Sequence, residues 1–120
     1  MPKRRPARKR AARKSRVPSS RKLPKDAVTL IVQLRAKPGQ EVLLEAELRA
    51  LVGPTRREPG CLMYDLHRAI EVPGTFVLHE VWQTRDHHRA HTKTPHFTRW
   101  DARKDALLAS REAAFCQQLA

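Results

Sequence analysis

The feature that most limits what this chain can fold into is the uneven distribution of its charge. Residues 1–25 hold twelve of the 25 Lys and Arg residues and none of the twelve Asp and Glu residues. Four prolines interrupt this segment, and its only large apolar residues are Met1, Val17 and Leu23. So little apolar surface cannot offset the entropy lost when a backbone becomes ordered, and like charges at this density extend the chain. Residues 1–25 are therefore predicted to form a disordered basic arm.

The remaining segment, residues 26–120, has an ordinary charge balance. It carries thirteen basic and twelve acidic residues, so its net charge is +1, whereas the net charge of the whole chain is +13. The high formal charge belongs to the arm and says nothing about the chemistry of the body. A segment of this length can bury one modest core, and a domain this small often gains stability by pairing with a second copy of itself. We expect one domain over residues 26–120.

Three roles remain open for the arm. It is a solvated tail without a specific task, a segment that binds nucleic acid or another polyanion non-specifically, or an organelle transit peptide. No aromatic residue is interleaved with the charges of residues 1–25 to stack on bases. The prolines and the missing apolar face argue against a transit peptide.

Cysteine content and hydropathy narrow the class of protein further. The two cysteines, Cys61 and Cys116, do not make a disulfide framework. No apolar run approaches the length that crosses a bilayer, and no apolar segment follows the N-terminal charges as a secretory signal requires. A cytoplasmic protein is the expectation.

Periodicity predicts how the body begins. Residues 27–36 alternate between apolar and polar side chains, which is typical of a strand. Residues 40–52 place their leucines at helical spacing, so an amphipathic helix is predicted there. Gly53 and Pro54 follow, and they are predicted to end or kink this helix because proline cannot donate a backbone hydrogen bond.

A hairpin and two short helices are predicted next. Residues 61–69 and 75–83 read as antiparallel strands joined by VPGT, which has proline and glycine where a type II turn needs them. Thr84 is predicted to cap a short helix that reaches His91. A further helix is predicted to begin at Thr94-Pro95, with a cap followed by proline at the first helical position.

The last ten residues give an ambiguous signal. Residues 111–120 favour a helix on propensity alone, and Phe115 and Cys116 are the only indication of a strand. Their conformation is left open at this point. Short strands mixed with amphipathic helices predict a two-layer α+β sandwich for the body as a whole.

Several blocks then occur in an order that resembles a known family. They are REPGC at residues 57–61, Tyr64, FVLHEVW at residues 76–82, His91, and TPHF at residues 94–97. Each block alone would be weak evidence. Together, over about residues 27–110, they resemble the antibiotic biosynthesis monooxygenase (ABM) family, and in particular its quinol-oxidising members.

The resemblance implies a ferredoxin-like β-α-β-β-α-β fold and a homodimer of the dimeric α+β barrel type, in which two sheets associate face to face. It also implies, for some members, oxidation of phenolic or quinol substrates by O2 with no metal, flavin or other cofactor. Other members degrade haem, modify small metabolites or have no known activity, so the family carries fold further than function. The family's last strand is rich in β-formers, and residues 111–120 are not, so a short or poorly formed fourth strand is expected.

The strand over residues 75–83 carries a candidate catalytic base. Glu80 and Trp82 are two residues apart, so they point to the same face, and His79 and Val81 point to the other. A carboxylate in an apolar row is costly unless it is paired or protonated. Glu80 is therefore a candidate catalytic base whose pKa is raised by desolvation. The alternative is a glutamate at the sheet edge that bonds a neighbouring group.

Histidines supply the other candidate catalytic residues. His91 and His96 flank the junction of the two short helices, and imidazole titrates near neutral pH, so each could remove a phenolic proton. The alternative is that one of them caps or packs a helix end. His87 and His91 are four residues apart with His88 beside them, which supplies two metal ligands but no clear third. No metal site is predicted.

Aromatic residues are the candidates for substrate binding. Tyr64, Trp82 and Phe97 could wall an apolar pocket between the sheet and the helices, and the alternative is that they are core residues. Cys61 has no evident partner base, so a nucleophilic role is not predicted.

Three functional hypotheses follow from different classes. The first is a cofactor-independent monooxygenase, a homodimer that oxidises a quinol-like or phenolic small molecule with O2. The second is a non-catalytic dimeric domain that binds a small apolar ligand. The third is a polyanion-binding protein in which the body only dimerises two basic arms, those of residues 1–25.

Overall fold

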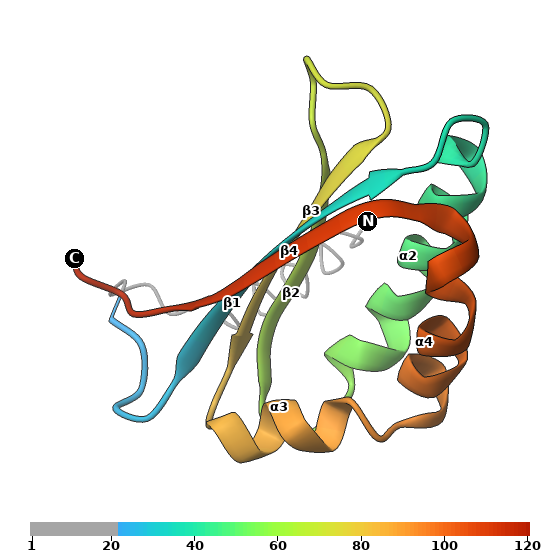
Figure 1. Cartoon of the computed structure of the whole chain (residues 1–120). Coiled ribbons are helices and arrows are strands. Elements are labelled where there is room, and N and C mark those ends of the chain that lie inside the picture. Colours follow the sequence, from blue (N-terminus) through green and yellow to red (C-terminus); the bar gives the residue numbers. More distant parts are fainter. Residues whose placement is uncertain (1–21) are drawn as a thin grey trace, which may run out of the picture.

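A computed structural model describes residues 22–120, which form a four-stranded antiparallel sheet and three helices (Figure 1). The elements in chain order are β1 (Val28–Ala36), α2 (Glu41–Arg56), β2 (Cys61–Arg68), β3 (Thr75–Trp82), α3 (Arg85–His91), α4 (Pro95–Leu107) and β4 (Leu108–Cys116). The strands lie in the order β2-β3-β1-β4, and each neighbouring pair is antiparallel. This confirms the ferredoxin-like α+β fold, with α3 as a short addition after β3.

Alternation along the strands directs one set of side chains beneath the helices. In β1 the residues Leu30, Val32 and Leu34 are buried, and the register pairs them with Glu80, Leu78 and Phe76 of β3. Figure 1 shows α2 and α4 on this side of the sheet. The sheet and the helices together form one core, whose members are Leu30, Val32, Leu34, Ala36, Leu44, Leu48, Leu51, Tyr64, Phe76, Leu78, Trp82, Trp100 and Leu107.

The predicted start signals of the two short helices are confirmed. The side chain of Thr84 accepts a hydrogen bond from the N–H of His87 at the start of α3, and that of Thr94 accepts one from the N–H of Phe97 at the start of α4. The predicted hairpin turn also forms, since Gly74 has a φ of 75°. These caps and turns fix where α3 and α4 begin relative to the sheet.

The C-terminal part of α2 differs from the prediction. The helix continues through Gly53 and Pro54 to Arg56, so a helix end at these two residues is wrong. Proline removes one backbone hydrogen bond, but the last turn is held by side chains. Arg56 Nε donates to the carbonyl oxygen of Tyr64 at 3.0 Å, and its guanidinium forms an ion pair with Asp65 at 2.9 Å. These tertiary contacts offset the lost bond.

The last strand is a second correction. A short or poorly formed fourth strand was the expectation, and it is wrong, because β4 pairs with β1 along eight residue pairs. Without β4, the backbone of β1 would present a row of unpaired N–H and C=O groups, so pairing outweighs the weak propensity of this segment. Phe115 anchors the end of β4 through two contacts with α3. The guanidinium carbon of Arg85 lies 3.8 Å from the ring centre of Phe115, and the ring centre of His88 lies 5.2 Å away in an edge-on arrangement.

The predicted basic arm lies mostly outside the described residues, which begin at residue 22. The disorder and polyanion-binding predictions for residues 1–25 therefore stay predictions, as does the domain boundary at residue 26. Of the arm's last four residues, Leu23 donates its N–H to the side-chain oxygen of Gln118 at 3.1 Å. None of the helices within residues 22–120 is long and apolar enough to cross a membrane.

Candidate active site

A cavity of about 270 Å³ lies between the sheet and α4. All four strands and α4 contribute to its lining, which consists of Val32, Leu34, Tyr64, Leu78, Glu80, Phe97, Trp100, Asp101, Lys104 and Arg111. Three of the predicted site residues are therefore brought together here: Tyr64, Glu80 and Phe97. Most of the remaining lining is apolar, as suits a small aromatic ligand.

Glu80 is the acidic group that β3 places under α4. Because β3 lies between β2 and β1, Glu80 is in the interior of the sheet and not at its edge, although it does bond a neighbouring side chain as that alternative expected. Its carboxylate accepts a hydrogen bond from the indole Nε1–H of Trp82 at 2.9 Å. Burial raises the pKa of Glu80 to about 7, against smaller lowering effects of Trp82 and Arg111. A carboxyl group with a pKa near the working pH is well suited to act as a general base.

Trp82 has a different place from the one predicted for it. Its side chain is fully buried and does not belong to the cavity lining. The indole of Trp82 donates its hydrogen bond to Glu80, and its ring centre lies 4.8 Å from the ring centre of His91. Trp82 therefore contacts two of the catalytic candidates, Glu80 and His91, without lining the cavity itself.

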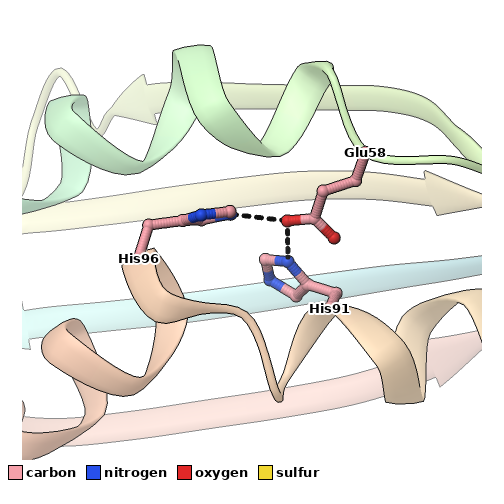
Figure 2. A group of neighbouring side chains, drawn as sticks. All are labelled: Glu58, His91 and His96. Carbon is pink, nitrogen blue, oxygen red and sulfur yellow. Dashed lines mark hydrogen bonds and ion pairs between the residues drawn. The ribbon is translucent and has the colours of Figure 1, made fainter.

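His91 and His96 are joined by a residue that was not predicted as part of the site. One carboxylate oxygen of Glu58, Oε2, lies 2.8 Å from Nδ1 of His91 and 2.6 Å from Nε2 of His96 (Figure 2). When this carboxylate is ionised it can only accept hydrogen bonds, and each ring then places an N–H toward Glu58. Glu58 thus sets the tautomer and the orientation of both histidines.

Local structure explains how this cluster assembles. His91 is the last residue of α3 and His96 is the second residue of α4. Between them, the hydroxyl of Thr94 donates to the carbonyl oxygen of His91 at 2.8 Å and also caps α4. Glu58 comes from the loop after α2, where its N–H donates to the carbonyl oxygen of Thr55 at 3.0 Å. The two helix ends and the loop therefore meet at one point.

The histidine cluster lies behind the aromatic wall of the cavity. The ring centre of His91 is 4.9 Å from that of Phe97 and 5.7 Å from that of Tyr64, and both aromatic residues line the cavity. Neither His91 nor His96 belongs to this lining. Burial lowers the pKa of His91, while the hydrogen bond to Glu58 acts in the opposite direction. His91 is accordingly a neutral imidazole near pH 7, in contact with the residues that shape the cavity.

Tyr64 is the second titratable group of the cavity wall. Burial raises its pKa well above 10, and the negative charge of Glu80 adds to this effect. The phenol of Tyr64 stays protonated across the physiological pH range, so it can shape the cavity but cannot serve as a base.

The structure also shows which residues could hold a metal ion. Within residues 22–120, Glu58, His91 and His96 offer three ligand atoms that lie within 4.8 Å of one another. Imidazole and carboxylate groups are ligands that divalent transition metals accept, although a metal would have to replace both hydrogen bonds to Glu58. His87, which the sequence spacing pairs with His91, does not belong to this group, and its Nδ1 lies 2.8 Å from the hydroxyl oxygen of Thr84.

Glu58 could not be found from local spacing. It lies 33 residues from His91 and 38 residues from His96 along the chain. The signals in the sequence are that Glu58 belongs to the REPGC block and precedes Pro59-Gly60, a pair that favours a turn. Gly60 has a φ of 79°, and its carbonyl oxygen accepts the N–H of Gln83 at 2.8 Å. This turn fastens the Glu58 loop to the end of β3.

Replacing Gly60 by alanine is expected to destabilise the protein by about 3 kcal/mol. The new methyl group would overlap the ring of His87 and lie 2.7 Å from its Cβ, in a backbone conformation that already disfavours a side chain. Gly39 is the matched control, since its φ is 86° and no atom of residues 22–120 lies within 4 Å of the added methyl group. Urea unfolding of Gly60→Ala and Gly39→Ala measures the difference, and equal losses would show that the contact with His87 is unimportant.

Known proteins resemble this chain in both sequence and fold. The model of the family described as antibiotic biosynthesis monooxygenase matches residues 27–103. The solved structure of PA3566 from Pseudomonas aeruginosa is 38% identical, with a TM-score of 0.77 over 80% of this chain and 97% of that one. Rv0793 from Mycobacterium tuberculosis is 33% identical over 81 residues, which are 68% of this chain and 79% of that protein. Its solved structure has a TM-score of 0.75 over 79% of this chain and 97% of that one.

A third relative, a Synechocystis protein, is 27% identical over 84 residues, which are 70% of this chain. The chain spans 57% of the length of that relative. The matches as a whole show the family, and this chain belongs to the antibiotic biosynthesis monooxygenase family. The resemblance predicted from the sequence blocks is confirmed.

Proposed function

We propose that this protein is a monooxygenase that uses O2, without metal or flavin, to oxidise a small electron-rich phenol or hydroquinone. The observation that carries the proposal is a buried carboxyl group, Glu80, which has a pKa of about 7 and faces a cavity of about 270 Å³ whose lining includes Val32, Leu78 and Phe97. Membership of the monooxygenase family supports a small-molecule substrate and O2. A base buried in a ligand-sized cavity is what this chemistry asks of a protein.

The proposed reaction begins when the carboxylate of Glu80 takes the phenolic proton of the substrate. The phenolate is electron-rich enough to pass one electron to O2, and the resulting pair recombines as a peroxide at a ring carbon that bears hydrogen. The O–O bond then breaks, the ring C–H becomes C=O, and the second oxygen atom leaves as water. The substrate supplies all four electrons and both hydrogen atoms of the water, and Glu80 returns its proton to the departing oxygen.

The histidine cluster is assigned a supporting role in this proposal. The ring of His91 packs against Phe97 and Tyr64, and neither His91 nor His96 belongs to the cavity lining. Held by Glu58, His91 fixes the aromatic wall against which the substrate ring would lie. We therefore propose that both histidines act by positioning and that Glu80 is the residue that touches substrate.

Oxygen consumption with a panel of hydroquinones and phenols tests the proposed function. The wild-type protein is expected to consume O2 with at least one member of the panel, and Glu80→Gln is expected to lose this activity. His91→Ala is expected to reduce turnover through a displaced cavity wall, and His96→Ala to have a smaller effect. Saturable binding of a panel member with no product would favour the non-catalytic alternative, and wild-type turnover in Glu80→Gln would contradict the role of Glu80.

A homodimer formed through the sheet is part of the proposal. Within the described chain, Ile31, Met63 and Val77 are half-buried on the face opposite α2 and α4. Thr29 and His79 belong to the same face and line, with Ile31 and Met63, a depression of about 480 Å³. A second copy of this face is the occupant that we propose, because two such surfaces would bury each other's apolar side chains.

Ile31→Glu is expected to convert this dimer into a monomer, because a charge buried at the centre of an apolar interface is costly. Sedimentation velocity at micromolar concentration measures the change. Val42→Glu is the matched control, since Val42 is 82% exposed on α2 and away from the sheet face. A wild-type protein that sediments as a monomer, or a dimer that survives Ile31→Glu, would contradict the face-to-face arrangement.

A further inference from the structure

We propose that the substrate of the cavity carries an anionic group, a carboxylate, and that Arg111 is the residue that binds it. This inference rests on the proposed function only in taking the cavity as the substrate site. It adds the substrate class to the proposed reaction: a phenol or hydroquinone that also bears a carboxylate on or near the ring.

The balance of charge around the cavity is the first observation. Four charged residues belong to its lining: Glu80, Asp101, Lys104 and Arg111. Lys104 and Asp101 neutralise each other through an ion pair of 2.7 Å on α4. Arg111, in contrast, takes part in none of the ion pairs that form within residues 22–120. Among the described residues that line the cavity, Arg111 is therefore the one cation that forms no ion pair.

The place of Arg111 in the sheet is the second observation. In β4 it pairs with Leu34 of β1, whose other neighbour is Phe76 of β3, so its side chain is on the face that the helices cover. Glu80 is four residues farther along β3 and two strands away. Standard sheet spacings put the two Cα atoms roughly 16 Å apart. Arginine and glutamate side chains that reach toward each other from these positions leave room for about one aromatic ring.

The chemistry of the two ends then defines the orientation of the substrate. A guanidinium group binds a carboxylate through two parallel N–H···O hydrogen bonds, which gives direction as well as affinity. With its carboxylate on Arg111, a substrate would present its opposite end to Glu80, where the proposed proton transfer takes place. The apolar residues between them, Val32 and Leu78, suit the ring itself.

Arg111 and Glu80, at the two ends of the cavity, also interact electrostatically. Arg111 lowers the pKa of Glu80, although burial outweighs this effect. A bound carboxylate would neutralise Arg111 and remove part of this influence. The cavity is thus small enough for the charge at one end to act at the other.

Ligand binding, which requires no turnover, tests this inference. Trp100 lines the cavity, so quenching of tryptophan fluorescence can report the affinity of 2,5-dihydroxybenzoate and of its uncharged methyl ester under nitrogen. The wild-type protein is expected to bind the acid about tenfold more tightly than the ester. Arg111→Gln is expected to remove this preference and to change the affinity for the ester less than threefold.

Two further variants sharpen the test. Arg111→Lys keeps the charge but not the paired hydrogen bonds, so it is expected to retain part of the preference. Arg103→Gln removes a positive charge from an arginine of α4 that pairs with Glu47 outside the cavity lining, and it should keep the full preference. Because Arg111 is exposed, its variants are expected to fold, and urea unfolding checks this.

The outcomes separate this inference from the proposed reaction. An equal affinity of the wild-type protein for acid and ester, or a preference that persists in Arg111→Gln, would overturn it. A clear preference that depends on Arg111, in a protein that consumes no O2 with either compound, would support the carboxylate site and count against the monooxygenase reaction.

Discussion

Glu80→Gln is expected to make the protein more stable at pH 8 while it reduces turnover by at least about 10²-fold. Burial raises the pKa of Glu80 from 4.5 to about 7, so the folded state binds this proton more tightly than the unfolded state does. The corresponding stability is complete below about pH 4.5 and is lost as the pH rises through 7. For a side chain this buried the loss is on the order of 3 kcal/mol, and glutamine does not ionise, so the variant avoids it.

Urea unfolding at pH 5 and pH 8 measures this effect. The free energy of unfolding of the wild-type protein should fall between these pH values by more than that of Glu80→Gln. Glutamine keeps an oxygen that can accept the Trp82 indole N–H, so the variant should not lose this contact. Glu71→Gln, at an exposed position, is the control and should keep the wild-type pH dependence. Parallel pH profiles for the wild-type protein and Glu80→Gln would show that Glu80 is not the desolvated group described above.

Glu58→Ala is expected to destabilise the protein by about 2 to 3 kcal/mol. The carboxylate of Glu58 accepts hydrogen bonds from His91 and His96. The side chain of His91 is only 1% exposed, so without Glu58 the ring N–H of His91 would be buried and would have lost its hydrogen-bond acceptor. Glu47→Ala is the control, because it breaks an ion pair with Arg103, which is 57% exposed. Such a surface pair contributes at most about 1 kcal/mol. Equal losses in the two variants would contradict the role of Glu58.

The pH dependence of turnover in Glu58→Gln shows whether Glu58 influences the catalytic groups or only stabilises the fold. The carboxylate of Glu58 raises the pKa of His91 through their hydrogen bond and also raises that of Glu80. Removing the charge should therefore lower both pKa values. The rise of turnover with pH, which follows ionisation of Glu80, should move to lower pH in Glu58→Gln. An unchanged pH profile would limit Glu58 to a structural role.

Local patterns predicted the parts of the fold that depend on nearby residues. Strand alternation placed Glu80 on the helix-covered face, and the caps Thr84 and Thr94 gave the correct starts of α3 and α4. The two errors, at Pro54 and in β4, have one cause. In both places, contacts with distant residues outweigh the preference of the local sequence.

Local periodicity likewise predicted some residues of the candidate site, whereas others are placed by contacts far apart in the sequence. Tyr64, Glu80 and Phe97 all line the cavity, because their faces follow from strand and helix periodicity. Their catalytic and substrate-binding roles stay predictions. Glu58 joins His91 across 33 residues, and no spacing rule reaches that far. Arg111 lies in the segment whose conformation the sequence left ambiguous, so its place at the cavity could be known only once β4 was seen to pair with β1.

The most direct test of the central claim, that Glu80 starts an oxygenation inside the cavity, uses isotopically labelled oxygen. Chelator-treated protein, confirmed free of metal and flavin, is given the panel phenol or hydroquinone that it turns over, under ¹⁸O2. The proposed mechanism predicts one ¹⁸O atom in the quinone product of the wild-type protein and no such product from Glu80→Gln. Unlabelled product, or labelled product formed equally by Glu80→Gln, would contradict it.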